Sequence, residues 1–462
     1  MSKFGRTTLR LAGGLMAALG IALPRGLTAA DSLSWQTNRN RVDADIQSWE
    51  LPRLLEEIAT VTGWQVWVEP GARHTTSTRF KDRPVKDALD MLLGDLSYVR
   101  VPQSNAPPKL VVFRTEQKEA IQRIPPRRDK AKAKPIPNEL IVTLKPGGNL
   151  DELAKKLGAK VVGRSKGRNS GRLQFENEEA AQAAREQLLQ EDDVGAIDSN
   201  FPILTQPSPD QLGNASLPNL RLAPVKEGDG IIVGLIDSPV QRQGTPLDNF
   251  LLQGISVAGD ANPSADQPTH GTAMWETILR GLSAGLESGS GSSVRVLPVD
   301  VYGNNSSTTT YEVAEGIVRA MEAGASIINL SLGSDGDTPY LHEIIREGQK
   351  AGRVFVASAG NEPVTTPTYP AAYPEVIAVT AGDGRGGIAS YANQGDFVDI
   401  VAPGTSLILF NGQSWRVSGT SPAAAGVAGL IAGTADAKGT APEKAATSVM
   451  NALPHRPDRP DR

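Results

Sequence analysis

From residue 206 onward, short apolar runs rich in β-branched residues alternate with longer segments of helical periodicity. The apolar runs lie at residues 231–237, 294–302, 326–332, 354–359, 376–380 and 398–402. Runs that are apolar without alternation indicate strands buried on both faces, and the helical segments between them supply the cover. We therefore predict an α/β domain over 206–450, with a mostly parallel sheet and helices on both faces. Ligand sites in such folds lie beyond the carboxyl ends of the strands.

Residues 40–115 have the pattern of a small α+β domain. Leu54, Leu55, Ile58 and Val61 repeat at helical spacing before Gly63, which predicts a helix and its end. A second helix is expected at 85–93, and strands at 65–68, 99–101 and 110–113. This order resembles the short domain at the N-termini of secretins and TonB-dependent receptors, and the resemblance implies a periplasmic module that binds an envelope protein. An α+β domain of another use is the alternative.

A second small unit spans residues 138–205. Its pattern predicts a β-α-β-β-α-β order, with strands at 140–144, 160–162, 172–175 and 194–197 and helices at 150–157 and 178–189. An unrelated ferredoxin-like module is one interpretation of this order. Two segments outside the domains are expected to be extended or disordered. These are the proline-rich basic linker at 116–137 and the tail at 451–462, which repeats Arg-Pro-Asp.

The first thirty residues have the layout of an export signal. Lys3, Arg6 and Arg10 are followed by a short apolar run at 11–23 and by small residues at 28–30. We predict a signal peptide over 1–30 that is removed before Asp31, since the run is short for a membrane span. No later segment is long and apolar enough to cross a bilayer, so the mature protein is expected in the periplasm or outside the cell.

Composition excludes several kinds of chemistry. The chain has 462 residues and no cysteine, which rules out thiolate catalysis, disulfides and cysteine-bound zinc. Its 47 basic and 51 acidic residues give a formal charge of -4, so nothing indicates a nucleic-acid footprint. Pairs of aspartates at 260 and 266 or at 335 and 337 could contribute ligands to a structural calcium. Short Asp/Gly loops are mostly turns, however, and we assign no metal and no cofactor.

Three polar residues stand at the ends of predicted elements in the large domain. Asp237 ends the strand at 231–237, His270 opens a helix, and Ser421 opens an apolar helix after Gly419. A serine at a helix start lies beside unpaired backbone N–H groups, which suits a nucleophile whose product is an oxyanion. Each residue alone has an ordinary structural explanation, as a turn, a core histidine or a cap. Together they form the order Asp, His, Ser, which is the order in subtilisin.

Residues 220–432 resemble a subtilisin-like serine protease. The segments 270–274, 328–333, 357–362, 401–404 and 419–426 carry the resemblance. The resemblance implies that Ser421 attacks the peptide carbonyl, that His270 moves the proton and that Asp237 orients the imidazole. It also implies that Asn361 donates to the oxyanion together with the backbone N–H of Ser421. Loss of such an amide costs on the order of 10²–10³ in turnover.

The same resemblance identifies a substrate-binding edge and an inhibitor. Substrate is expected to pair as an added strand along Ser331, Leu332 and Gly333, with Ala359 and Gly360 on the opposite side. Residues 138–205, placed just before the protease-like domain, look like the inhibitory propeptide of this family. The implied molecule is a zymogen that acts on polypeptides and cleaves itself between residues 202 and 216.

Several positions depart from the family pattern. Pro239 stands where glycine is usual, and Trp275 and Glu276 replace small residues on the helix that His270 opens. A large ring on a packed helix needs compensating space. These departures support a second hypothesis, in which the protease domain is inactive and the protein is an envelope binding or regulatory module.

The first specificity pocket also differs from the family. Thr368 stands where glycine often lines this pocket, which predicts a shallow pocket for small side chains. Cleavage of a peptide library measures this preference, and a preference for large aromatic residues would refute it. The Tyr369–Pro370 bond is expected to be cis, because the family often has a cis peptide there.

Overall fold

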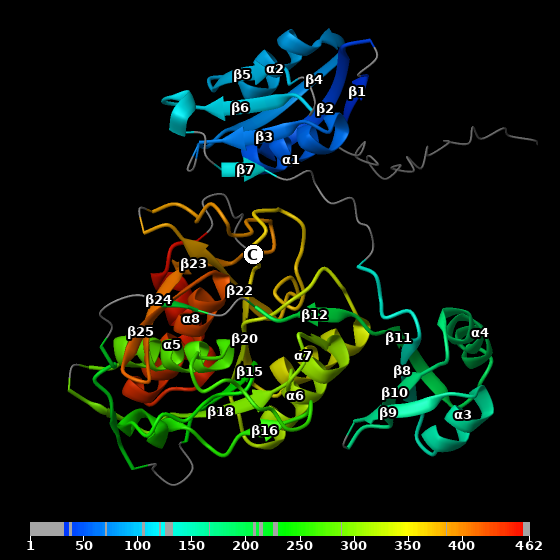
Figure 1. Ribbon diagram of the computed structural model, residues 1–462, viewed down its shortest axis with the longest axis vertical. Coiled ribbons are helices and arrows are strands. Elements are labelled where there is room, and N and C mark those ends of the chain that lie inside the picture. The colour runs from blue at the N-terminus through cyan, green and yellow to red at the C-terminus, as the bar shows by residue number, and fades with distance from the viewer. Residues whose placement is uncertain are drawn as a thin grey trace, which may run out of the picture.

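The computed structural model describes residues 32–455 apart from gaps at 37–38, 70–71, 104–106, 120–121, 125–132, 166, 207–208, 212–215, 225–229, 288 and 385. The predicted signal peptide and residues 456–462 lie outside the described residues. Figure 1 shows three folded units along the chain: an N-terminal unit, a smaller unit beside helices α6 and α7, and a large α/β domain.

The N-terminal unit contains two sheets and two helices. One sheet has the order β1-β2-β4 and the other β5-β6-β3-β7. Its elements are β1 (Ser32–Gln36), β2 (Arg41–Glu50), α1 (Leu51–Thr62), β3 (Gln65–Val68), β4 (Thr75–Pro84), α2 (Val85–Leu93), β5 (Ser97–Val101), β6 (Lys109–Phe113), the 3-10 helix η1 (Gln117–Glu119) and β7 (Gln122–Ile124). Both predicted helices form, and apolar residues of α1 and α2 fill a core shared with the strands.

This unit is larger than the pattern predicted. The sequence analysis did not predict strands β1, β2 and β4. Strand β4, for example, consists mostly of polar residues, and its pairing with β2 holds it in a sheet. The segment predicted as a linker also differs, since β7 within it pairs antiparallel with β3. Buried Ile124 explains this pairing, as it contributes one apolar side chain to the core of the unit.

The second unit has the predicted β-α-β-β-α-β order. Its elements are β8 (Glu139–Leu144), α3 (Leu150–Leu157), β9 (Lys160–Arg164), β10 (Ser170–Gln174), α4 (Glu178–Leu188) and β11 (Val194–Ser199). The antiparallel sheet has the order β11-β8-β10-β9. Asn149 and Asn177 cap the two helices by accepting backbone N–H groups with their side chains, which explains where the helices begin.

The large domain is built on a seven-stranded parallel sheet with the order β16-β18-β15-β20-β21-β22-β23. Its strands are β15 (Ile232–Asp237), β16 (Ile255–Ser256), β18 (Arg295–Asp300), β20 (Ile327–Leu330), β21 (Val354–Ser358), β22 (Val376–Gly382) and β23 (Ile400–Pro403). Six of the seven lie within the apolar runs of the sequence or extend them by one or two residues. The α/β fold with a parallel sheet is therefore confirmed.

Helices cover both faces of this sheet. The helices are α5 (His270–Gly285), α6 (Thr310–Glu322), α7 (Pro339–Lys350), α8 (Thr420–Lys438) and α9 (Pro442–Ala452), with a 3-10 helix η2 (Pro246–Phe250). One apolar core lies under α5, α8 and α9, and the other lies under α6 and α7. The sheet is thus a buried layer, as its continuous apolar strands require.

Glycines let α5 and α8 approach unusually closely. A Cβ on Gly281 would lie 2.1 Å from the carbonyl oxygen of Gly426, and one on Gly429 would lie 2.0 Å from that of Ile278. No real side chain tolerates such distances, so the two backbones meet only because these positions lack a Cβ. This contact matters for function because α5 begins at His270 and α8 begins at Thr420, directly before Ser421.

The remaining strands form small pairs around the large sheet. They are β12 (Pro202–Leu204) with β19 (Ser307–Thr309), β13 (Asp210–Gln211) with the hairpin β24 (Thr405–Phe410) and β25 (Gln413–Ser418), and β14 (Arg221–Leu222) with β17 (Gly291–Ser292). Within the described part of the chain, no helix combines the length and the apolar character that a bilayer span requires.

The predicted disordered tail at 451–462 needs a correction at its start. Helix α9 continues to Ala452, the N–H of Val401 donates to the carbonyl oxygen of Pro454 at 2.8 Å, and His455 bridges to Ile400. Strand β23 is the edge of the sheet, and the tail pairs with backbone groups that would otherwise be open. The polar composition of the tail gave no sign of this pairing, because backbone groups and not side chains form it.

Candidate active site

Asp237 and His270 meet at the carboxyl end of the central strand β15. Nδ1 of His270 lies 2.8 Å from Oδ1 and 2.9 Å from Oδ2 of Asp237, and both residues are buried. A carboxylate only accepts, so Nδ1 carries the proton and Nε2 is the acceptor nitrogen. The arrangement therefore fixes one tautomer of the imidazole.

The start of helix α5 is tied to the loop after Asp237. The Ser238 hydroxyl donates to Asp237 at 3.1 Å and accepts the N–H of Gly271 at 2.9 Å. A Cβ on Gly271 would lie 2.1 Å from the Ser238 carbonyl oxygen, so only glycine fits after the histidine. Thr269 caps the helix and donates to the carbonyl oxygen of Pro239 at 2.5 Å. These contacts hold the imidazole at a fixed place relative to the strand end.

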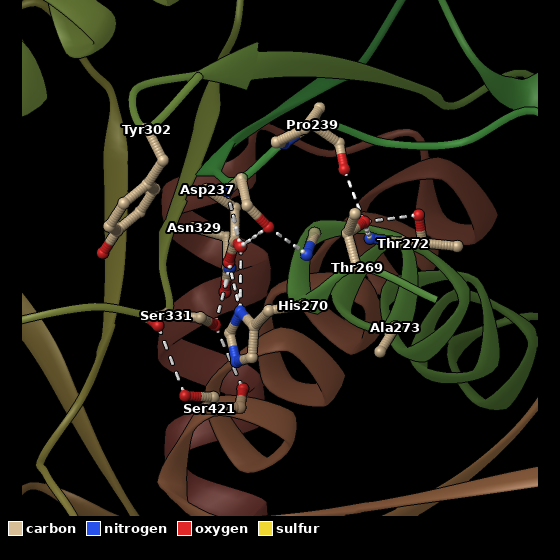
Figure 2. A network of polar contacts seen from close by, with 12 residues as sticks. Asp237, Pro239, Thr269, His270, Thr272, Ala273, Tyr302, Asn329, Ser331 and Ser421 are labelled. Atoms are coloured by element: carbon tan, nitrogen blue, oxygen red, sulfur yellow. Dashed lines mark hydrogen bonds and ion pairs between the residues drawn. The ribbon is translucent and has the colours of Figure 1, made fainter. Parts of the chain in front are cut away.

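Ser421 lies on the first turn of α8 and faces the same place. Figure 2 shows the ring of His270 between the carboxylate of Asp237 and the side chain of Ser421. The Ser421 hydroxyl donates to the carbonyl oxygen of Ser331 at 3.3 Å, and the Ser331 hydroxyl donates back to the Ser421 carbonyl oxygen at 3.1 Å. For attack on a carbonyl, the hydroxyl proton has to turn from Ser331 toward Nε2 of His270.

Asn361 places its side-chain amide beside the nucleophile. Its Oδ1 accepts the N–H of Thr420 at 2.8 Å and the Thr420 hydroxyl at 3.1 Å. Because Oδ1 already accepts two hydrogen bonds, the Nδ2 group is the free donor of this amide, and it would lie 3.1 Å from a Cβ on Gly419. A neutral donor at the serine-bearing helix start is what an oxyanion needs.

A second carboxyl lies next to Asp237 on the neighbouring strand. Asp300 of β18 pairs in register with Asp237 of β15 and is buried. Its Oδ1 accepts the N–H groups of Tyr302 and Gly303, each at 2.9 Å. Burial raises the pKa of Asp300, the two N–H groups oppose this, and the charge of Asp237 adds to the rise. Asp300 therefore holds its proton to a higher pH than a free carboxyl.

The predicted substrate-binding residues follow two neighbouring strands of the sheet, and Ser331 contacts Ser421. Strand β20 leads into Ser331, Leu332 and Gly333, while strand β21 leads into Ala359 and Gly360. Thr368 joins the two sides: its Cγ2 would lie 3.0 Å from a Cβ on Gly333, and its Oγ1 would lie 3.3 Å from one on Gly360. A threonine side chain between two glycines narrows the space that a bound side chain could enter. The Tyr369–Pro370 peptide bond is cis, as predicted.

The departures on helix α5 are accommodated without disturbing this geometry. Trp275 is fully buried in the core beneath α5 and α8. Glu276, also fully buried, accepts the N–H of Leu409 at 3.0 Å and pairs with Arg280 at 2.6 Å. Burial raises the pKa of Glu276, and these two partners oppose the rise. The large residues thus fill the space between α5 and the β24–β25 hairpin.

The chain between the second unit and the large domain pairs twice with strands of the large domain. Strand β12 pairs antiparallel with β19, and the next residue, Thr205, donates its N–H to the carbonyl oxygen of Ser306 at 2.9 Å. A few residues later β13 pairs with β25, a strand that ends three residues before Ser421.

Asn393 is an important residue that the sequence analysis did not single out. Its Oδ1 accepts the N–H of Glu362 at 2.9 Å, and its Nδ2 donates to the Ala359 carbonyl oxygen at 2.8 Å and to Thr368 at 3.0 Å. It lies more than thirty residues from Ala359 in a segment without a motif, so only the fold reveals its role. The described residues contain no cluster of acidic or histidine side chains arranged for a metal ion.

Comparison with known proteins agrees with this arrangement. Residues 228–459 match the model of the subtilase family, and residues 124–200 match the model of the fervidolysin N-terminal prodomain. The chain is similar to the thermophilic serine proteinase of Bacillus sp. strain AK1, with 35% identity over 45% of this chain and 52% of the relative. It is also similar to thermitase of Thermoactinomyces vulgaris, with 33% identity over 45% of this chain and 77% of the relative.

Among solved structures, fervidolysin from Fervidobacterium pennivorans, a keratinolytic enzyme related to subtilisin, has a similar fold. The likeness covers 66% of this chain and 55% of that one, with 20% sequence identity and a TM-score of 0.52. The chain spans about half the length of the Bacillus proteinase. A family match over half of the chain, with relatives that share a third of the aligned residues, establishes the relationship. The chain belongs to the subtilase family, as a subtilisin-like serine protease with a fervidolysin-like prodomain.

Proposed function

We propose that this protein is an exported endopeptidase that hydrolyses polypeptides and is made as a self-processing zymogen. The observation that carries the proposal is the convergence of Asp237, His270, Ser421 and Asn361, from four separate elements, at one edge of the sheet. A carboxylate, an imidazole, a hydroxyl and a neutral amide donor are the groups that acyl transfer needs.

Each group has one role in the proposed reaction. The Ser421 oxygen attacks the peptide carbonyl as Nε2 of His270 takes its proton. The carbonyl oxygen becomes an oxyanion held by Nδ2 of Asn361 and the N–H of Ser421. His270 then returns the proton to the departing amine, and the acyl-enzyme is hydrolysed by water along the same path. Asp237 holds the tautomer and stabilises the imidazolium throughout.

The contacts of the second unit support its role as an inhibitory prodomain. Arg172 of β10 pairs with Glu312 of α6 at 2.8 Å, and Asn200 accepts from the Thr310 hydroxyl and the Tyr311 N–H, both at 3.1 Å. Ile203 of β12 is buried in the core beneath α6 and α7. These contacts hold the second unit against α6 and place β12 antiparallel to β19 of the large domain.

The expected position of self-cleavage lies between the two strand pairings that β12 and β13 make with the large domain. We expect the scissile bond between Thr205 and Asp210, a narrower range than residues 202–216. Pro207 and Pro209 lie in this interval and lack the N–H groups that strand pairing would use. The interval is therefore a natural break between β12 and β13.

Export is part of the proposal and rests on the signal-like residues 1–30. In this proposal the N-terminal unit resembles the short N-terminal domain of secretins and TonB-dependent receptors and could bind an envelope protein.

Intact mass spectrometry of the protein from cell fractions tests export and processing together. We expect an N-terminus at Asp31 in the periplasmic or extracellular fraction, and a catalytic fragment that begins between residues 206 and 210. Recovery of only the uncleaved 462-residue chain in the cytoplasmic fraction would contradict export. A signal-cleaved but otherwise intact chain would contradict self-processing alone.

A further inference from the structure

A fully buried carboxylate lies on the side of the N-terminal unit that faces the large domain. Glu56 of α1 has 0% of its surface exposed, which is rare for a glutamate unless it has partners. Its Oε2 accepts the hydroxyl of Thr365, more than three hundred residues away, at 2.6 Å. Figure 1 shows α1 and β7 on the lower side of the N-terminal unit, toward the ends of β22 and β23. The two units are thus joined by a buried hydrogen bond.

Thr365 belongs to the loop 362–368. This loop begins directly after Asn361 and ends at Thr368, which lies beside the predicted substrate-binding residues Gly333 and Gly360. Asn393 holds the loop through the N–H of Glu362 and the hydroxyl of Thr368. A Cβ on Gly395 would lie 2.2 Å from the Thr365 carbonyl oxygen, so the loop also packs closely against this glycine. Glu56 therefore contacts the loop that joins Asn361 to Thr368.

The contact belongs to a broader interface. A cavity of about 440 Å³ is lined by both units. Leu51, Leu55 and Val68 come from the N-terminal unit, and Ile388 and Leu453 from the large domain. Apolar residues on both sides, with one buried polar link beside them, are the composition of a docking surface between domains rather than of two independent solvent-exposed faces.

The N-terminal part of the chain therefore holds the large domain at two separate places. The prodomain lies against α6 and α7 through Arg172 and Asn200, and the N-terminal unit lies against the loop 362–368. Residues 125–132 connect the two units in the sequence. A cut between Thr205 and Asp210 would leave both units on one fragment, and two linked contacts dissociate far more slowly than either alone, with gains of roughly 10²–10⁴ in avidity.

We propose that the N-terminal unit, residues 32–124, is a second anchor of the autoinhibitory fragment, docked through Glu56 on the loop 362–368 of its own catalytic domain. It keeps the prodomain in place after cleavage and holds the loop 362–368. The partner of this surface is thus the same chain, and release of the N-terminal unit is a separate step in activation. This inference rests on the proposed zymogen function only for the release step.

Hydrogen–deuterium exchange in the full-length Ser421→Ala background tests the docking without any need for catalysis. Glu56→Ala and Thr365→Val remove the same hydrogen bond from opposite sides. Each is expected to raise exchange of peptides covering 362–368 by about tenfold, since a hydrogen bond to a carboxylate is lost. The double variant should exchange no faster than either single variant, because the two changes remove one interaction.

Asp90→Ala is the matched control, because its carboxylate pairs with Lys86 and Tyr98 within the N-terminal unit. It should leave exchange at 362–368 unchanged. Unchanged exchange in both Glu56→Ala and Thr365→Val, or full additivity in the double variant, would overturn the proposal. A Glu56→Ala variant that keeps Ser421 can cleave itself. After cleavage, gel filtration should show that its N-terminal fragment dissociates at least tenfold faster than that of the wild type. If the chain does not process itself, the exchange result still decides the docking.

Discussion

Replacing Ser421 by alanine is expected to reduce peptide hydrolysis on the order of 10⁶-fold and to leave a full-length, signal-cleaved chain. The Ser421 hydroxyl is the nucleophile of the proposed mechanism, and its removal leaves only the binding and oxyanion contributions. Hydrolysis of a fluorogenic peptide measures the first effect. Intact mass after purification measures the second, because the bond between Thr205 and Asp210 should stay uncut.

Ser418→Ala is the matched control for this variant. Ser418 precedes Ser421 by three residues, and its hydroxyl contacts Thr405 at the surface. Processing and hydrolysis should both persist in the control. Processing of Ser421→Ala at the wild-type rate would show that another protease makes the cut, and residual hydrolysis within tenfold of wild type would remove Ser421 from the mechanism.

The variant Asp237→Asn should lower kcat by about 10⁴-fold with little change in KM. The amide would present a donor to Nδ1 of His270, which selects the tautomer whose Nε2 carries the proton and cannot accept one from Ser421. The loss corresponds to about 5.5 kcal/mol of transition-state stabilisation. Steady-state kinetics separates the two constants, and the fold should survive because the shape of the side chain is kept.

Asp300→Asn is the corresponding control, since Asp300 occupies the same register position on the neighbouring strand. It changes a buried carboxyl of equal size that does not contact His270, and kcat should stay within about tenfold of wild type. If Asp237→Asn retained kcat at that level as well, the imidazole would not depend on Asp237 for its orientation. In that case the contact between Asp237 and His270 at the end of β15 would have no catalytic role.

Much of the large domain could be predicted from its hydrophobic pattern. Strands buried on both faces must be apolar throughout. Continuous apolar runs in the sequence therefore predict these strands, which are β15, β18, β20, β21 and β22. The site residues were visible because of where they stand: Asp237 ends an apolar strand, and His270 and Ser421 lie in the first turns of two predicted helices. The strand-rich parts of the N-terminal unit were missed because β4 is mostly polar and depends on its neighbours.

The pairings of β12 with β19 and of β13 with β25 could not be predicted from the local sequence. Strands β12 and β13 are two or three residues long and pair with segments about one hundred and two hundred residues away. Asn393 and the contact between Glu56 and Thr365 are equally remote. Such contacts depend on where the chain returns in space, and no periodicity or motif encodes that distance.

For this protein, the sequence alone determined the buried parallel sheet, the β-α-β-β-α-β prodomain and the order of the acid, the base and the hydroxyl. These follow from residue type and spacing, which act over one element at a time. Only the tertiary structure decided that α5 and α8 meet through glycines, that the Asn361 amide lies beside Gly419 and Thr420, and that β12 and β13 pair with β19 and β25. The reason is physical: those features arise from contacts between distant elements, where close packing and the need to pair buried polar groups leave one arrangement.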